Sequence, residues 1–209
     1  LIVPDGDYYE SIIFNGKSIH VKAEGVNTRI LGLGVASENL VSFLNGEGPN
    51  TIFEGFTLDG TGITNSTFTG IIKVQGSGPH LLDLNITSAS IDLGRGVYIK
   101  SGNAYVENCG IENSKIGIYI DGDRGSILDT VVIRNNTEHG LDIKDTESTF
   151  VVQIIDSTIS LNVAQEGAAV ECYDASPYFL GCTIAYNDAG PNQLEIAPIR
   201  VKGGSGNYS

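Results

Sequence analysis

The sequence GVYI at 96–99 is repeated as GIYI at 117–120, GLDI at 140–143 and GAAV at 167–170. The glycines of these four units lie 21, 23 and 27 residues apart. Because side chains alternate between the two faces of a β-strand, the two apolar residues of each unit point to the same side. One strand cannot bury such a surface alone, so units of this length are expected to stack into a solenoid with internal apolar columns.

A second pattern lies between these units and ends each time on asparagine. It consists of CGIEN at 109–113, VVIRN at 131–135, STISLN at 157–162 and CTIAYN at 182–187. We interpret it as a second strand in every turn of the solenoid, followed by inward asparagines that bond to the backbone of neighbouring turns. The predicted asparagine ladder contains Asn113, Asn135, Asn162 and Asn187. An inward Asn135 could not carry a glycan, although it begins an Asn-x-Ser/Thr triplet.

The two patterns predict an all-β fold, a right-handed parallel β-helix built as a single-stranded solenoid of about eight rungs. The expected domain covers 1–202, and the Gly/Ser-rich segment 203–209 is expected to be a tail. Helical repeats are excluded because the apolar residues recur at i and i+2, and not at i, i+3 and i+4. One buried column is predicted to contain Ile99, Ile120, Ile143 and Val170.

Composition narrows the classes of partner. The chain has 25 acidic and 12 basic residues, a net charge of −13, which argues against nucleic acid as a partner. The same charge disfavours polyanionic glycans unless a cation such as calcium bridges them. No apolar run approaches the length of a membrane span, so none is predicted. Among Cys109, Cys172 and Cys182 we favour buried free thiols, with a Cys172–Cys182 disulfide as the alternative.

Outward positions of the first strand give two predicted ladders along the surface. The first contains Lys73, Tyr98, Tyr119, Asp142 and Ala169, and the second contains Gln75, Lys100, Asp121, Lys144 and Glu171. Alternating charges of this kind stabilise a sheet, which is the structural interpretation. The functional interpretation is substrate binding, with Tyr98 and Tyr119 as an apolar platform for sugar rings and with Lys100 and Lys144 beside them.

Catalytic and metal-binding candidates are few. Asp121 and Asp142 lie two positions out of register on adjacent rungs, about 8 Å apart at Cα, which is near the carboxyl spacing of an inverting glycosidase. Arg124, in DGDRG at 121–125, lies next to Asp121 and Asp123 and is the arginine best placed for a catalytic role. Asp121 and Asp123 could also bind calcium. A segment rich in Asp and Gly is, however, more often only a turn. His20, His80 and His139 lack metal-ligand spacing. Candidate glycosylation sites are Asn65, Asn85 and Asn207.

Longer stretches resemble a known group of proteins. The segment VPDGDYYESIIFNGKSIHVKAEG at 3–25, with TRILG and FEGFTLDG after it, is similar to the opening rungs of the pectin-lyase-like superfamily of right-handed parallel β-helices. The segment VECYDASPYFLGCTIAYNDAG at 170–190 resembles repeats of secreted and cell-surface β-helix proteins. The resemblance implies a substrate groove along the outer strand face. Of the motifs of polygalacturonase-like hydrolases, only EHG at 138–140 and DIK at 142–144 have counterparts here.

The expected function is therefore a secreted or cell-surface module with a structural, adhesive or glycan-binding role. Its expected partners are a polysaccharide or neighbouring copies of itself. Relatives usually begin with a helix that caps the first rung, and here the strand expected at 1–5 could instead pair with a neighbour's last rung. The alternative is a polysaccharide lyase or glycoside hydrolase, which we disfavour. No cofactor is expected apart from possible calcium.

Overall fold

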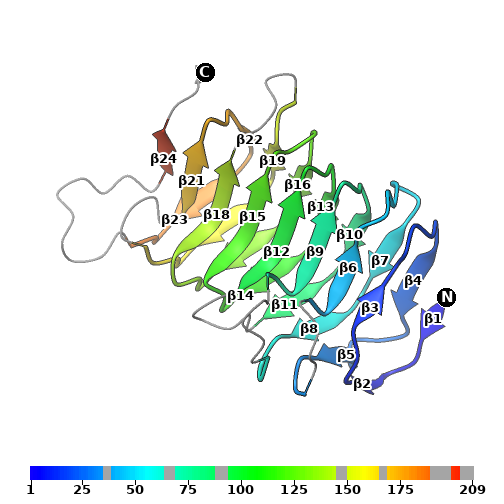
Figure 1. Cartoon of the computed structure of the whole chain (residues 1–209). Helices are drawn as coiled ribbons and strands as arrows, with labels where there is room; N and C mark the ends of the chain where they lie inside the picture. The colour runs from blue at the N-terminus through cyan, green and yellow to red at the C-terminus, as the bar shows by residue number, and fades with distance from the viewer. Residues whose placement is uncertain are drawn as a thin grey trace.

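The computed structural model describes residues 1–34, 39–63, 69–87, 94–144, 150–164, 169–188 and 199–202. These residues contain no helix and form a right-handed parallel β-helix of three sheets, which we name A, B and C, with eight strands in each. Figure 1 shows the strands of sheet C side by side and pointing the same way, from β3 near the N-terminal end to β24 near the C-terminal end. The predicted all-β solenoid is confirmed.

Each coil of the chain passes through sheets A, B and C in turn. Sheet A contains β1 (Ile2–Val3), β4 (His20–Ala23), β7 (Ile52–Glu54), β10 (His80–Leu82), β13 (Tyr105–Glu107), β16 (Ile127–Asp129), β19 (Gln153–Ile155) and β22 (Tyr178–Leu180). Sheet B contains β2 (Gly6–Tyr8), β5 (Thr28–Leu31), β8 (Thr57–Asp59), β11 (Asn85–Thr87), β14 (Gly110–Glu112), β17 (Val132–Arg134), β20 (Thr158–Ser160) and β23 (Thr183–Ala185). Sheet C contains β3 (Ile12–Ile13), β6 (Val41–Phe43), β9 (Ile72–Gln75), β12 (Arg95–Lys100), β15 (Ile116–Asp121), β18 (His139–Lys144), β21 (Val170–Tyr173) and β24 (Ile199–Lys202).

The apolar columns fill the interior as the repeat predicts, except on one rung. Ile99, Ile120 and Ile143 lie in register and are fully buried. The residue that continues this column is Cys172, whereas Val170 lies beside Leu141 in the neighbouring column. The prediction for Val170 was therefore wrong by two residues.

The error has a simple cause. The expected alignment matched Gly167 to Gly140, but the strand register places Ala169 beside Gly140. Ala169 is consequently buried, and not outward as predicted. Glu171 moves into the ladder of Asp142. Gly167 itself lies outside the described residues.

The asparagine ladder exists, but two of its predicted members are wrong. The backbone N–H of Asn136 donates to Asn162 Oδ1 at 3.1 Å, and that of Asn162 donates to Asn187 Oδ1 at 3.0 Å. The backbone N–H of Ser114 donates in turn to Asn136 Oδ1 at 3.0 Å. The ladder therefore runs through Asn136, and not through Asn135, and Ser114 occupies its first place.

Asn113 and Asn135 lie one residue earlier, at an exposed corner between sheets B and C. Both have a φ of 56°, in the left-handed region that asparagine tolerates better than most residues. Leu161 and Tyr186 occupy the same corner in later coils, with φ of 58° and 57°. Because Asn135 points to solvent, the argument that it could not carry a glycan does not hold.

All three cysteines are free thiols. Burial raises the pKa of Cys109 and of Cys172 to about 12, so both remain uncharged and act as small apolar residues in the core. Cys182 is half-buried.

The left-handed corner gives a stability prediction. Replacing Leu161 by asparagine should raise the free energy of unfolding by about 1 kcal/mol, because the left-handed conformation is sterically less favourable for leucine than for asparagine. Urea unfolding monitored by circular dichroism measures the change. The matched control is Asn135→Leu at the same corner, which should lower stability by a similar amount. Destabilisation by Leu161→Asn would show that the exposed leucine contributes contacts that outweigh its backbone conformation.

Candidate functional site

Sheet C carries an unusual share of the positive charge. Half of the twelve basic residues of the chain lie in its strands, against three acidic ones. The basic residues are Lys73, Arg95, Lys100, Lys144, Arg200 and Lys202, and the acidic ones are Asp121, Asp142 and Glu171. This sheet is thus locally basic within a chain whose net charge is −13.

Two tyrosines form the centre of the outer face of sheet C. Tyr98 and Tyr119 lie in register on β12 and β15, with ring centroids 5.3 Å apart and planes inclined by 42°. Both side chains are half-buried, and burial raises the pKa of both hydroxyls. The predicted vertical pair is therefore present, and its tilt leaves it uneven and not flat.

A cation that sequence reasoning missed packs against this pair. The guanidinium carbon of Arg95 lies 5.0 Å from the ring centroid of Tyr98 and 4.4 Å from that of Tyr119. The ammonium of Lys144 lies 5.2 Å from the Tyr119 ring. Contacts of this kind hold both cations against the rings. No signal in the sequence pointed to this contact, because a residue three positions before Tyr98 points to the opposite face of a regular strand.

Asp142 follows Tyr119 in the same ladder and is nearly inaccessible. Its exposed fraction is 2%, although it lies on the outer face of the sheet. Oδ2 contacts Lys144 Nζ at 3.2 Å, while Oδ1 is buried and has no hydrogen-bond partner in the described part of the chain. Burial raises the pKa of Asp142, an effect that Lys144 partly offsets. The carboxyl is thus biased toward its protonated form.

A second carboxylate lies directly beside it on the next coil. Glu171 is in register with Asp142 and contacts His139 Nε2 at 3.1 Å and Lys202 Nζ at 3.8 Å. The negative charge of Glu171 adds to the rise of the Asp142 pKa. The closest carboxyl pair on this face is therefore Asp142 with Glu171, a pair that the shifted alignment had concealed.

Asp121 does not belong to this carboxyl pair and lies in the neighbouring ladder. It is in register with Lys100 on one side and Lys144 on the other, so this part of the predicted charge ladder has the expected order. Tyr173, and not Glu171, continues the ladder after Lys144. The register agrees with the structural interpretation of Asp121 and separates it from Asp142 by two strand positions.

The turn after β15 uses Asp123 for its own structure. Asp123 is fully buried and accepts hydrogen bonds from the backbone N–H groups of Gly125 at 2.7 Å and Ser126 at 2.8 Å. Its other carboxylate oxygen accepts the Ser126 hydroxyl. Arg124 is exposed in the same turn. Within the described ranges no group of three or more His, Cys, Asp or Glu side chains could hold a metal ion.

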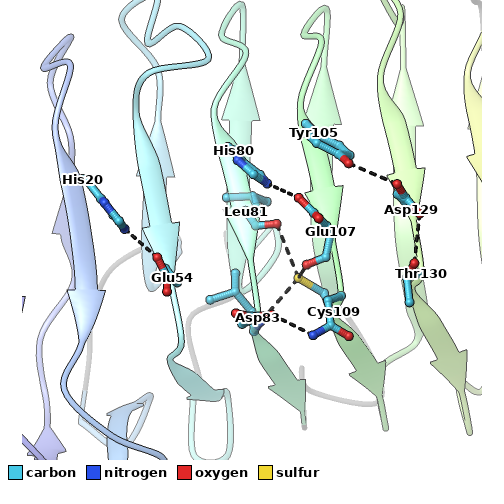
Figure 2. Close-up of polar contacts among 12 residues, drawn as sticks. His20, Glu54, His80, Leu81, Asp83, Tyr105, Glu107, Cys109, Asp129 and Thr130 are labelled. Carbon is cyan, nitrogen blue, oxygen red and sulfur yellow. Dashed lines mark hydrogen bonds and ion pairs between the residues drawn. The ribbon is translucent and has the colours of Figure 1, made fainter.

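On sheet A, polar side chains of neighbouring coils bind one another in pairs (Figure 2). His20 contacts Glu54 at 2.6 Å, and His80 contacts Glu107 at 2.8 Å. The His80 ring stacks on Tyr105 at 4.6 Å, and the Tyr105 hydroxyl donates to Asp129 at 3.1 Å. Burial, together with Asp129, raises the pKa of Tyr105 to about 12. These groups satisfy one another, which indicates a stabilising role.

Two of the Asn-x-Ser/Thr asparagines are exposed. They are Asn85, on β11, and Asn135, at the corner described above. Asn65 and Asn207 lie outside the described residues.

Comparison with known proteins gives one match. A family model described as "Right handed beta helix region" matches residues 53–208. None of the curated proteins matches the chain. None of the solved structures matches it either.

The buried carboxyl of Asp142 predicts a pH effect on stability. Its pKa is raised above the ordinary value of 3.8 in the folded protein, so the folded state binds the proton more tightly than the unfolded state does. This contribution is fully present below about pH 4 and is lost as the pH rises through the folded-state pKa. Asp142→Asn removes the titration. Wild-type stability should therefore fall relative to that variant between pH 4 and 8, measured by urea unfolding. A relative gain over this range would mean that Lys144 holds Asp142 ionised.

Proposed function

The chain belongs to the right-handed β-helix family, and from this premise we propose that it is a glycan-binding module whose sheet C binds an acidic polysaccharide. The family is consistent with the pectin-lyase-like superfamily that the sequence resembles. The observation that carries the proposal is the half-exposed pair Tyr98 and Tyr119, set in the basic face of an otherwise acidic chain.

The tyrosines supply the apolar part of the site. The C–H faces of sugar rings pack on aromatic rings, and Tyr and Trp combine such a surface with a polar group. Arg95 lies over both rings, and although its Nη1 donates to the Thr69 carbonyl oxygen at 3.3 Å and its Nε is buried, the guanidinium has five N–H groups, so Nη2 still offers donors there. A sugar ring on Tyr98 and Tyr119 would therefore meet an apolar surface and hydrogen-bond donors together.

The cations select the charge of the glycan. Lys73 lies in register beside Tyr98, and the exposed Lys100 lies two positions along β12. Carboxylate or sulfate groups on a polysaccharide would meet these ammonium groups directly. The calcium bridge expected from the net charge is then unnecessary, because charges within a Debye length act more strongly than the distant acidic surface. Binding should weaken as salt rises.

The proposed location is the cell exterior or the cell surface, where long polysaccharides occur. The resemblance to secreted and cell-surface β-helix proteins supports it. A structural or adhesive role is compatible with such binding, and pairing with neighbouring copies stays a prediction.

Binding to acidic polysaccharides can be measured by affinity electrophoresis in gels that contain pectate or alginate. The double variant Tyr98→Ala/Tyr119→Ala should lose about tenfold in affinity, equivalent to about 1.4 kcal/mol. Tyr178→Ala on sheet A, where the tyrosine is 49% exposed, is the matched control and should bind as wild type does. Equal retardation of wild type and the double variant would remove sheet C as the site.

Cleavage of the glycan is the second candidate function, and the environment of Asp142 favours it. A carboxylic acid whose pKa is raised by burial can act as a general acid, and Glu171 lies beside it as the second carboxyl group. The chain would then be a glycoside hydrolase that uses Asp142 to protonate the leaving oxygen.

Incubation with the same polysaccharides separates cleavage from binding alone. Hydrolysis would release new reducing ends, and Asp142→Asn should reduce their rate of formation by at least about a hundredfold. Unsaturated products would instead identify a lyase, and binding with neither product supports the binding module. Asp121→Asn is the control, and an equal loss there would contradict the assignment to Asp142.

A further inference from the structure

A groove of about 870 Å³ lies on the outer face of sheet B, away from the tyrosine pair. It extends over the strands β11, β14 and β17 and over the corner between sheets A and B. Its floor consists of outward residues of one row, Asn85, Gly110 and Val132, which are in register on successive coils. The groove belongs to the continuous part of the solenoid, where every strand is paired on both sides.

Gly110 makes the hollow. It lies between Asn85 and Val132 and presents no side chain on a face where its neighbours do. A Cβ added at Gly110 would lie 3.0 Å from Asn85 Oδ1 and meet nothing else within 4 Å. The Gly110 backbone is extended and needs no left-handed φ, so the glycine is not required by its conformation. Its effect is to leave space open to solvent.

Two polar pairs form the walls of the groove. On one side Arg134 Nε donates to Glu112 Oε2 at 2.7 Å. On the other side Asn108 Nδ2 donates to Asp83 Oδ1 at 2.7 Å. Each pair is fixed by one hydrogen bond, and each retains further donors and acceptors, because a guanidinium, an amide and a carboxylate have more than one site. Planar groups held in this way suit adjacent hydroxyl groups of a ligand.

We propose that this groove is a second binding site, specific for a neutral sugar chain. The charged groups among the described lining residues are two carboxylates and one guanidinium, from Asp83, Glu112 and Arg134, so they offer no excess of positive charge to an anion. This is the opposite of sheet C. The proposal goes beyond the acidic-glycan site and does not depend on it.

Other ligand classes fit the groove less well. An extended peptide would need unpaired backbone groups to add as a strand, but the backbones of β11, β14 and β17 are already paired on both sides. Nucleic acid needs cations for its phosphates and aromatic rings for its bases, and no aromatic side chain is among the described residues that line the groove. Hydroxyl-rich ligands need the amides, hydroxyls and charged planar groups that are present.

The test fills the groove without touching the core. Gly110→Tyr places a ring in the hollow, and Thr183→Tyr places the same ring in the same row two coils beyond Val132, outside the groove. Wild type and both variants are compared by affinity electrophoresis against neutral polysaccharides, namely galactan, arabinan, xyloglucan and glucomannan. Circular dichroism verifies that each variant is folded.

We expect wild type and Thr183→Tyr to bind at least one neutral polysaccharide, and Gly110→Tyr to lose at least tenfold in affinity for it. The Tyr98→Ala/Tyr119→Ala variant should retain that binding, which distinguishes this site from the one on sheet C. If Gly110→Tyr does not fold, Glu112→Gln with Arg134→Gln replaces it and should show the same loss. Unchanged binding in the groove variants, or no binding of wild type to any of the four, would overturn the proposal.

Discussion

Parallel register between successive coils places each side chain about 4.8 Å from its equivalents above and below. Each side chain therefore has to be compatible with the side chains in register with it on the coils above and below. In the interior this yields apolar columns such as Ile99, Ile120 and Ile143. On the surface it yields rows in which opposite charges alternate, as Lys100, Asp121 and Lys144 do. A row that departs from this rule is informative, because the departure costs stability.

The rule is broken most clearly at Asp142 and Glu171. These carboxyl groups are direct neighbours on adjacent coils, and Asp142 is buried as well. Two such groups cannot both ionise without repulsion, so the pair is stable only if one is protonated or if cations surround it. Here Lys144, Lys202 and His139 provide cations or donors, and the pKa of Asp142 is raised. Sheet A also places two carboxylates in register, Glu107 and Asp129, but there Glu107 contacts His80 and Asp129 accepts a hydrogen bond from the Tyr105 hydroxyl.

The sequence predicted those parts of the fold and of the site that depend only on the alternation of side chains along a strand. The buried isoleucines and the vertical pair of Tyr98 and Tyr119 follow from alternation within strands of equal spacing. What it could not predict was the length of the segment between β18 and β21, because the alignment placed Gly167 beside Gly140, whereas Ala169 occupies that position directly before β21. That shift of two residues hid the proximity of Glu171 to Asp142. Arg95 was missed because its contact with the tyrosines depends on a side-chain direction.

The corner between sheets B and C shows a second limit. Asn135 and Asn136 are adjacent in sequence, and both types of position, the left-handed corner and the internal ladder, favour asparagine. The apolar pattern cannot show which of the two asparagines takes the corner and which takes the ladder, because it locates the strand but not the residue at which the chain turns. Burial decides, since Asn136 donates and accepts inside the coil while Asn135 faces solvent.

Specialisation of the three faces follows from the same register. Each sheet repeats its own set of outward positions, so the three faces can differ in chemistry while sharing one core. Sheet A closes its polar groups in pairs, sheet C gathers cations around aromatic rings, and sheet B leaves a polar hollow at Gly110. Paired groups occupy the outer face of sheet A, whereas sheet C presents rings with cations and sheet B presents a hollow between its paired groups. Sheets C and B are therefore the faces on which we propose binding, of an acidic glycan on sheet C and of a neutral one on sheet B.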